Sequence, residues 1–459
     1  MPSNKHDIAI VGAGVVGCAL ARRLTLDGAS VIVLEKAYDV LDGASKGNSA
    51  ILHTGFDAPP GSLELDCIKS GYNEYLEVSE SLSLPILKSG ALVLAWDSEQ
   101  LKVLPKLIEK AHENGIFNVR PLDREEILRR EPELSREVLG GFEVPGEYII
   151  DPWASAHAYI GQAVENGANL WRGVEVLSGN FEQNYWTLET STEKVYSRYL
   201  INCGGLYGDL LDERLIKKKN FKITPRKGQF VIFDKAASSL VSSTVLPIPT
   251  ATTKGVVICR TIFGNLLVGP TAEDQESRRN SATDSSTLVK LCKKGSTIIP
   301  KLENYDITSS YAGLRPATQY SDYQIHHKTE MAYLTVGGIR STGLSAALGI
   351  ANYVSKILSE MGFEFSPLKN PKLPEVDKLS EYHERDWQIP GADGVVCHCE
   401  MVTKREIERV INGPIPPQTI QGLKRRTRVA MGRCQGFYCS AELTRITNGK
   451  LKIPLICNE

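Results

Sequence analysis

The sequence predicts a fold in three parts: an α/β domain of the doubly wound type, an α+β domain with a mixed sheet, and a small C-terminal domain held by cysteines. Two observations lead to this prediction. A short apolar run followed by a glycine-rich turn opens the chain, and two close cysteine pairs lie near its end. The length of 459 residues also exceeds that of a typical single domain, so two or three domains are expected.

The glycine-rich turn has the context of a dinucleotide-binding motif. An apolar run of buried-strand type precedes G-A-G-V-V-G, a helical stretch follows, and a second apolar run ends at Glu35. In a G-x-G-x-x-G turn of this Rossmann-like kind, Gly12 permits the tight turn, Gly14 lets the backbone approach a pyrophosphate, and Gly17 lets helix and strand pack closely. The helix start directs unpaired N–H groups at the phosphates, and Glu35 can accept hydrogen bonds from a ribose diol.

Three further segments favour FAD over NAD. They are D-G-A-S-K-G-N-S at 42–49, Y-L-I-N-C-G-G at 199–205, and Y-L-T-V-G-G-I-R-S-T-G-L at 333–344. In this order they resemble the FAD-dependent oxidoreductase family that contains D-amino acid oxidase, glycerol-3-phosphate dehydrogenase and L-2-hydroxyglutarate dehydrogenase. A helix expected at 345–361 would stabilise negative charge on the reduced flavin through its first N–H groups. The resemblance implies that FAD contacts Gly12, Gly14, Gly17, Glu35, Lys36, Ser45, Asn48, Ser49, Val176, Gly204, Gly338, Gly343 and Leu344.

The flavin segments are discontinuous in the sequence, so the stretches between them must form a second unit. Strand-like runs in those stretches predict a mixed sheet that caps the flavin and shapes a substrate pocket. Four prolines in a stretch with few apolar residues predict a linker that wraps back over the first domain. We therefore expect an FAD-binding domain at 1–85, 145–215 and 325–365, a substrate or cap domain at 86–144 and 216–324, a linker at 366–396, and a cluster domain at 397–459.

Four cysteines in the last segment have the spacing of metal ligands. Cys397 and Cys399 form a C-x-C pair, and Cys434 and Cys439 form a C-x4-C pair. Four thiolates can hold a [2Fe–2S] cluster or one zinc ion. The sequence T-R-V-A-M-G-R-C-Q-G at 427–436 resembles the [2Fe–2S] domain related to bacterioferritin-associated ferredoxin, which favours the cluster over zinc. The other six cysteines are expected to be core residues or inert thiols: Cys18, Cys67, Cys203, Cys259, Cys292 and Cys457.

Two residues are candidates for the chemistry. His53 lies in a segment similar to the N-S-x-x-x-H-x-G loop of L-2-hydroxyglutarate and glycerol-3-phosphate dehydrogenases, which runs beside the flavin ring. A neutral imidazole there suits the removal of a hydroxyl proton, although a structural histidine is the alternative. Arg315 lies in a segment similar to the G-x-R-P of glycerol-3-phosphate dehydrogenases, where a guanidinium can hold a carboxylate or phosphate.

Two basic segments have less defined roles. Arg226 opens a strand of the expected cap domain, where it either adds positive charge to the pocket or is solvated. The run K-R-R-T-R at 424–428 precedes Cys434, and its charge would stabilise an anionic cluster. Part of that run is expected to form a solvated face.

Bulk composition excludes some classes of partner. A net charge of −1 provides no general attraction to nucleic acid or anionic membrane. We find neither a signal peptide nor an apolar window long enough to span a bilayer. The sparse cysteines fit a reducing compartment. We therefore expect a cytoplasmic protein, with peripheral contact to a membrane left open.

Over nearly its whole length the chain resembles the large catalytic subunit of anaerobic-type glycerol-3-phosphate dehydrogenases. This implies oxidation of a small anionic secondary alcohol, foremost glycerol 3-phosphate, with electrons passing through the cluster to an acceptor protein or quinone-linked carrier, and further subunits as partners. The segment P-G-S-L at 60–63 and Cys67 look more like L-2-hydroxyglutarate dehydrogenase, and the G-G-L-R-Y stretch of aerobic relatives is replaced by T-G-F-D at 54–57. An amino-acid or opine dehydrogenase subunit and a non-catalytic electron carrier are the remaining alternatives.

Overall fold

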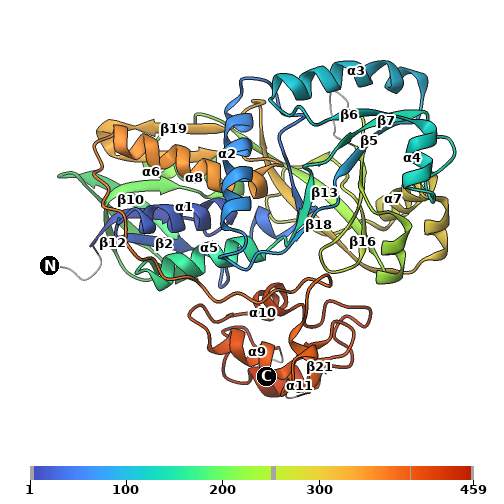
Figure 1. The fold of residues 1–459 in the computed structure, drawn as a ribbon. Helices are drawn as coiled ribbons and strands as arrows, with labels where there is room; N and C mark the ends of the chain where they lie inside the picture. The colour runs from blue at the N-terminus through green and yellow to red at the C-terminus, as the bar shows by residue number, and fades with distance from the viewer. Residues whose placement is uncertain (1–4, 250–254, 393, 456–459) are drawn as a thin grey trace.

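The computed structural model describes residues 5–249, 255–392 and 394–455. Two large sheets lie side by side, and a small helical domain packs beneath them (Figure 1). This arrangement confirms the predicted fold class, with α/β and α+β parts and a small C-terminal domain. Cys457 lies outside the described residues. No helix within them is long and apolar enough to cross a membrane.

The first sheet carries the glycine-rich turn. Its path runs β10-β11-β12-β1-β2-β9, β20 pairs in parallel with β12, and β19 pairs with β20. Because β1, β2, β9, β12 and β20 run parallel, their carboxyl ends meet at one edge, where ligands bind in such sheets. The strands are β1 (Lys5–Val11), β2 (Val31–Glu35), β9 (Asn169–Arg172), β10 (Val176–Glu182), β11 (Tyr185–Thr190), β12 (Val195–Asn202), β19 (Gln324–Lys328) and β20 (Tyr333–Gly337).

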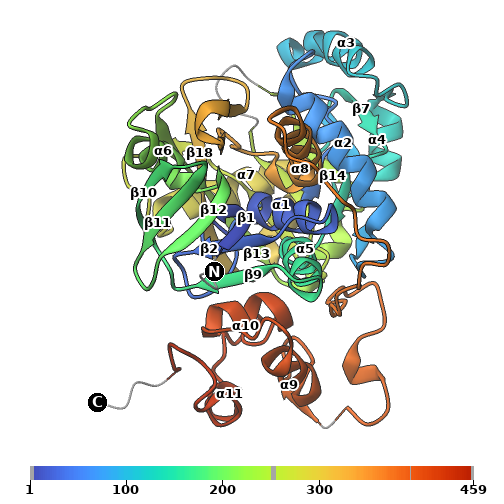
Figure 2. The ribbon, with the colours of Figure 1, turned by 90° about the vertical axis from the view of Figure 1, so that its left-hand side faces the viewer.

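Helices bury one face of this sheet in the largest core of the molecule, and Figure 2 shows α1, α5 and α8 together beside it. α2 and α8 cross at very short range, because a Cβ on Gly71 would overlap the Ser345 carbonyl and one on Gly349 would overlap the Cys67 carbonyl. This crossing fixes the start of α8 near the strand edge. The helices are α1 (Val15–Leu26), α2 (Leu63–Val78), α5 (Ala154–Glu165) and α8 (Gly343–Glu360), and α6 (Gly208–Ile216) packs on the other face.

The second sheet is mixed, as predicted. Its path runs β17-β13-β16-β15-β14-β5-β7-β6, with β18 on the long strand β13, and apolar clusters cover both of its faces. The strands are β5 (Ala91–Ala95), β6 (Arg120–Asp123), β7 (Gly140–Val144), β13 (Ile223–Phe233), β14 (Thr244–Pro247), β15 (Val257–Arg260), β16 (Leu266–Gly269), β17 (Glu273–Asp274) and β18 (Ile307–Thr318). The helices are α3 (Ser98–Glu113), α4 (Arg124–Arg130) and α7 (Ser285–Ile298).

A third sheet has three strands. It consists of β3 (Ile51–Leu52), β8 (Tyr148–Ile150) and β4 (Ile86–Leu87), in the order β3-β8-β4. β3 and β8 are antiparallel, with Leu52 opposite Tyr148. This register brings the residues just after β3 next to those just before β8.

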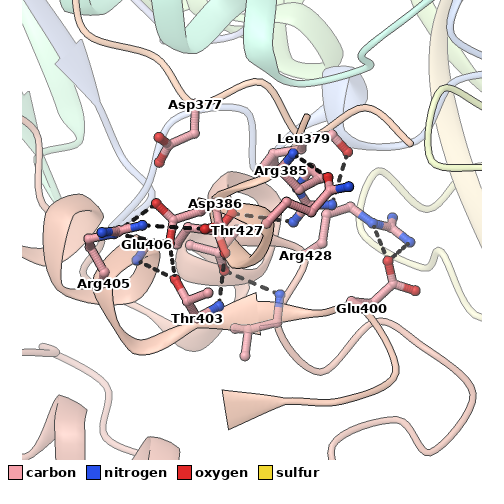
Figure 3. A network of polar contacts seen from close by, with 12 residues as sticks. Asp377, Leu379, Arg385, Asp386, Glu400, Thr403, Arg405, Glu406, Thr427 and Arg428 are labelled. Atoms are coloured by element: carbon pink, nitrogen blue, oxygen red, sulfur yellow. Dashed lines mark hydrogen bonds and ion pairs between the residues drawn. The ribbon is translucent and has the colours of Figure 1, made fainter. Parts of the chain in front are cut away.

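The small domain contains β21 (Val395–Cys397), β22 (Val402–Thr403), α9 (Lys404–Asn412), α10 (Ile420–Thr427) and α11 (Ser440–Thr447) around a core of its own. The preceding segment attaches it by polar contacts (Figure 3). Asp386 accepts hydrogen bonds from Thr403, Arg405 and Arg409, and Arg385 pairs with Glu406. Upstream, Ser366 and Leu368 donate backbone bonds to Asp27 and Leu26 of the first domain.

Candidate functional site

One cavity of about 990 Å³ collects nearly all of the predicted flavin-site residues. Its volume lies at the upper end of the range for ligand pockets, about 300–1,000 Å³. Gly338 does not line it; that residue makes a left-handed turn, with φ of 70°, leading to Ile339 and Arg340, which do. The predicted residues on its wall are Gly12, Gly14, Gly17, Glu35, Lys36, Ser45, Asn48, Ser49, His53, Val176, Gly204, Arg315, Gly343 and Leu344.

The first glycine turn leaves no room for side chains. A Cβ on Gly12 would come within 2.5 Å of the Cys203 carbonyl oxygen, and Gly12 has a φ of 108° that L side chains rarely adopt. A Cβ on Gly17 would overlap the Gly12 carbonyl oxygen. The turn between β1 and α1 is therefore packed backbone against backbone. The start of α1 lines the cavity at Val15, Val16 and Gly17, where phosphate binding would place it.

Glu35 stands at the carboxyl end of β2 with its carboxylate held in place. One oxygen accepts from the Ala13 N–H at 2.7 Å and the other from the Ala37 N–H at 2.8 Å. Burial raises the pKa of Glu35, and these two backbone donors act against that rise. Each oxygen keeps a second lone pair, which suits a ribose diol. Next to it, the Lys36 ammonium lies 3.3 Å from the centre of the Tyr207 ring.

The loop after β2 forms the middle of the cavity wall. Ser45 Oγ accepts the Val15 N–H at 3.0 Å, and the Asn48 side chain bonds Ser45 O and the Ala50 N–H. Gly47 crosses Gly313 of β18 so closely that a Cβ on Gly313 would overlap the Gly47 carbonyl. Gly313 is the glycine of the G-x-R-P segment, and nothing in the sequence indicated that it crosses Gly47.

His53 follows β3 and faces a buried carboxylate. Its Nδ1 lies 2.8 Å from Glu147 Oε2, and the Glu147 side chain is fully buried. Glu147 Oε1 accepts from the Thr54 N–H at 2.6 Å and from the Thr54 hydroxyl at 2.8 Å. The His53 backbone N–H donates to Ser345 Oγ at the start of α8. Glu147 was not predicted, because 94 residues separate it from His53.

Arg315 lies on β18 directly opposite Arg226 of β13. Arg226 makes a two-pronged ion pair with Asp274, at 2.6 and 3.0 Å, so its charge is largely neutralised. Arg315 is half-buried, donates to the Thr271 carbonyl, and pairs with no acidic side chain of the described residues. Burial, helped by the Arg226 charge, lowers the pKa of Arg315 to about 10. Arg315 is therefore the better prepared of the two to receive an anion in the cavity.

The four predicted cysteine ligands come together in the small domain as two pairs. The thiols of Cys399 and Cys434 interact most strongly, as do those of Cys397 and Cys439, and Cys399 also interacts with Cys397 and Cys439 with Cys434. No three His, Cys, Asp or Glu side chains in the described part of the chain converge on a single ion. Four cysteine thiols gathered in this way suit ligation of a [2Fe–2S] cluster or of one zinc ion.

The loop that carries Cys434 directs backbone donors at its sulfur. N–H groups of Tyr438, Gly436 and Phe437 lower the pKa of Cys434, with burial acting in the opposite direction. Such hydrogen bonds to sulfur are among the factors that set a cluster's potential. Gly432 packs against Cys399, because a Cβ there would overlap Cys399 Cβ.

The basic run at 424–428 differs from the expectation, since none of its residues forms a solvated face. α10 packs against the first domain, where Arg425 donates to the Val40 carbonyl, and Arg426 bonds the Ile415 carbonyl within its own domain. Arg428 is buried and pairs with Glu400. Only Lys424 has the predicted setting: burial lowers its pKa, and the Cys439 and Cys397 thiolates oppose that shift.

A packed contact joins the small domain to the cavity wall. The Arg428 guanidinium lies 3.9 Å from the centre of the Phe263 ring, and Phe263 stacks on Trp153 at 5.7 Å. The Trp153 indole N–H donates to the carbonyl of Lys46, which lines the cavity. Arg433 adds an ion pair with Asp234 at the same interface. A chain of three contacts therefore connects Arg428 of the small domain to the cavity wall at Lys46.

The residues present fit the expected groups. The crowded glycine turn, the open start of α1 and the fixed Glu35 carboxylate suit the pyrophosphate and ribose of a dinucleotide. The paired thiols and the loop N–H groups suit an anionic iron–sulfur cluster. We therefore assign FAD to the cavity and a [2Fe–2S] cluster to the four cysteines.

Comparisons with known proteins agree with both assignments. The FAD dependent oxidoreductase family model matches residues 7–357, and the BFD-like [2Fe-2S] binding domain matches residues 395–448. A glycerol 3-phosphate dehydrogenase of Caloramator mitchellensis is 33% identical over 98% of this chain and 95% of its own length. Human mitochondrial L-2-hydroxyglutarate dehydrogenase is 26% identical over 68% of this chain and 78% of its own.

Among solved structures, the L-alpha-glycerophosphate oxidase of Mycoplasma pneumoniae with FAD bound superimposes with a TM-score of 0.73. It is 26% identical, and the match covers 80% of this chain and 97% of that one. The protein therefore belongs to the FAD-dependent oxidoreductase family and carries a BFD-like [2Fe–2S] binding domain.

Proposed function

We propose that this protein oxidises glycerol 3-phosphate to dihydroxyacetone phosphate and passes the electrons on through its iron–sulfur cluster. The observation that carries the proposal is the pairing of one cation and one base on the same cavity wall: Arg315, which has no acidic partner among the described residues, and His53 beside Glu147. The substrate comes from the similarity to a glycerol 3-phosphate dehydrogenase along nearly the whole chain.

In this proposal the chain's own residues bind the substrate and move its proton. Arg315 holds the phosphate with charge-assisted hydrogen bonds and so orients the secondary alcohol. His53 Nε2 takes the hydroxyl proton while the carbon-bound hydrogen leaves with its electron pair. Bound FAD supplies the two-electron acceptor for that hydride. The apolar side chains of Ile51, Phe56 and Phe230 line the same cavity and limit access of water.

The cluster domain implies a partner that accepts electrons one at a time. We propose an electron-transfer protein or a quinone-linked carrier as that acceptor, with further subunits in the working complex. The contact through Arg428, Phe263 and Trp153 supports transfer within one molecule, because it packs the small domain directly against the cavity wall.

The test is an anaerobic titration of the purified protein with glycerol 3-phosphate, followed by visible and EPR spectroscopy. Bleaching of the flavin together with a reduced [2Fe–2S] signal is the expected result. If glycerol 3-phosphate does not bleach the flavin but another tested compound does, that compound replaces glycerol 3-phosphate as the proposed substrate. Zinc in a colourless protein would contradict the electron-relay role.

A second candidate substrate is L-2-hydroxyglutarate. A guanidinium holds a carboxylate as well as a phosphate, and the segment 54–57 brings no second cation to the cavity. Similarity to L-2-hydroxyglutarate dehydrogenases extends over 68% of the chain in the human case. Including L-2-hydroxyglutarate and a set of amino acids in the same titration separates these substrates.

A further inference from the structure

We propose that Glu147 is a positioning residue for the reaction, which sets the tautomer of His53 and stabilises the imidazolium that forms when His53 takes a proton. This inference rests on the proposed function, because it assigns Glu147 a task only if His53 is the base. It adds a partner for the base that sequence reasoning did not find.

The fold places the two side chains together without help from a loop. β3 and β8 are antiparallel with Leu52 opposite Tyr148, so the next pair in register is His53 with Glu147. The two residues stand at the end of the paired strands β3 and β8 of the three-stranded sheet. Ser345 Oγ, at the start of α8, accepts the His53 backbone N–H and fixes the histidine from the other side.

The hydrogen bonds around Glu147 define the direction of the proton on His53. The Thr54 hydroxyl accepts the Phe56 N–H and therefore points its own proton at Glu147 Oε1, which also takes the Thr54 N–H. Oε2 is left to receive a proton from His53 Nδ1 at 2.8 Å. With its proton on Nδ1, the neutral imidazole keeps a lone pair on Nε2.

The free nitrogen is the one that the reaction needs. Within the described residues Nε2 makes no hydrogen bond, and His53 lines the cavity with 17% of its side chain exposed. When Nε2 takes the hydroxyl proton, the alcohol carbon gives its hydride to FAD and becomes a ketone carbon. The resulting imidazolium lies beside a buried carboxylate, which stabilises its charge.

Glu147→Gln tests this arrangement with little change in shape. The amide oxygen can still accept both Thr54 donors, but its NH₂ group then faces Nδ1 and forces the proton onto Nε2. We expect the rate of flavin reduction in anaerobic stopped-flow experiments to fall roughly 10²–10⁴-fold. The substrate dissociation constant and the FAD content should stay within about threefold of wild type, since neither depends on a proton-transfer step.

Two variants serve as controls. Glu131→Gln changes another buried carboxylate, which accepts the Ser242 and Ser243 N–H groups and does not line the cavity, and should leave flavin reduction unchanged. Glu147→Asp keeps the charge on a shorter side chain and should recover part of the lost rate. A purely structural role for Glu147 would instead make Gln the milder substitution.

The decisive measurement is a double-mutant cycle with His53→Ala. Glu147→Gln should have no further effect on reduction when His53 is already absent, because the carboxylate acts through the imidazole. A second, additive loss would overturn the proposal. If flavin reduction is normal in Glu147→Gln but slow in His53→Ala, the proposed role of Glu147 is rejected and that of His53 stands. Normal reduction in His53→Ala would reject the proposed base as well.

Thr54→Val provides a route if Glu147→Gln does not retain FAD. It removes one donor to Glu147 Oε1 and loosens the carboxylate without touching His53. We expect a several-fold slower reduction that disappears in the His53→Ala background. An unchanged rate in Thr54→Val, or the same loss in both backgrounds, would overturn the proposal.

Discussion

The FAD cavity and the cluster domain are built by opposite means. The cavity is formed by backbone that approaches backbone, at Gly12, Gly17 and the Gly47–Gly313 crossing, and large apolar cores hold its walls. The cluster site is formed by four side chains on short segments of a domain with a small core. One chain thus carries a redox site specified by shape and another specified by ligands. A substitution that abolishes cofactor binding at one site should therefore leave the other site intact.

The largest effect should come from filling the glycine turn. In Gly17→Ala the added methyl overlaps the Gly12 carbonyl, so strand and helix must move apart. We expect loss of bound FAD and a stability cost of about 1–3 kcal/mol or more, with the iron–sulfur EPR signal retained. Gly208→Ala is the control, because its new Cβ would find only ordinary contacts. Equal loss of FAD in both variants would contradict the role of the close-packed glycine turn in binding FAD.

Removing a cluster ligand should have the opposite effect, with the cluster lost and FAD retained. Cys434→Ser, or Cys399→Ser in the other half of the same pair, should abolish the [2Fe–2S] signal and destabilise the small domain, whose folding is coupled to its metal. Flavin reduction by substrate should persist, while reduction of a one-electron acceptor protein falls. Cys292→Ser is the matched control, since that thiol lies outside the quartet. Flavin loss in Cys434→Ser would show that the sites are not separable.

Inside the cavity, the two facing arginines should differ. Arg315→Met removes a half-buried cation that has no acidic partner among the described residues, and we expect substrate binding to weaken by about 1.5–3 kcal/mol, or roughly 10–150-fold. Arg226→Met removes a cation already paired with Asp274, and binding should change little. Dissociation constants from the anaerobic titration decide between them. A larger effect at Arg226 would reverse the assignment.

The smallest effect should appear where the linker holds the cluster domain. Burial alone would raise the pKa of Asp386, but hydrogen bonds from Thr403, Arg405 and Arg409 outweigh it and lower the pKa below 3.8. Asp386→Asn should cost about 1–3 kcal/mol at neutral pH, seen in the thermal transition of the cluster domain and not in flavin reduction.

The pH dependence of that difference follows from the lowered pKa. The Asp386 contribution is present above the unfolded pKa and is lost as pH falls through the folded one. The difference in the free energy of unfolding between wild type and Asp386→Asn should stay constant from pH 7 to 5 and narrow below about pH 3.8. A gap that grows on acidification would contradict this sign.

Motifs made of contiguous residues can be recognised in the amino-acid sequence alone. The G-x-G-x-x-G turn, the 42–49 loop and the C-x-C and C-x4-C pairs place glycine or cysteine where local backbone geometry or metal spacing demands it. The family and both cofactors follow from these segments, and the comparisons confirm them. The run at 424–428 shows the limit, because charge alone did not reveal that Arg425 and Arg428 are buried at a domain contact.

By itself, the sequence determined the three-part fold, the two cofactors and the residues that local motifs carry. Only the tertiary structure decided which distant residues act on one another. It brought Glu147 to His53 through strand pairing and placed Arg428 on Phe263. It also gave Arg226 a carboxylate and, within the described residues, left Arg315 without one. The physical reason is that spacing along the chain specifies local backbone geometry, whereas the partner of a buried charge depends on which strands and domains pack together.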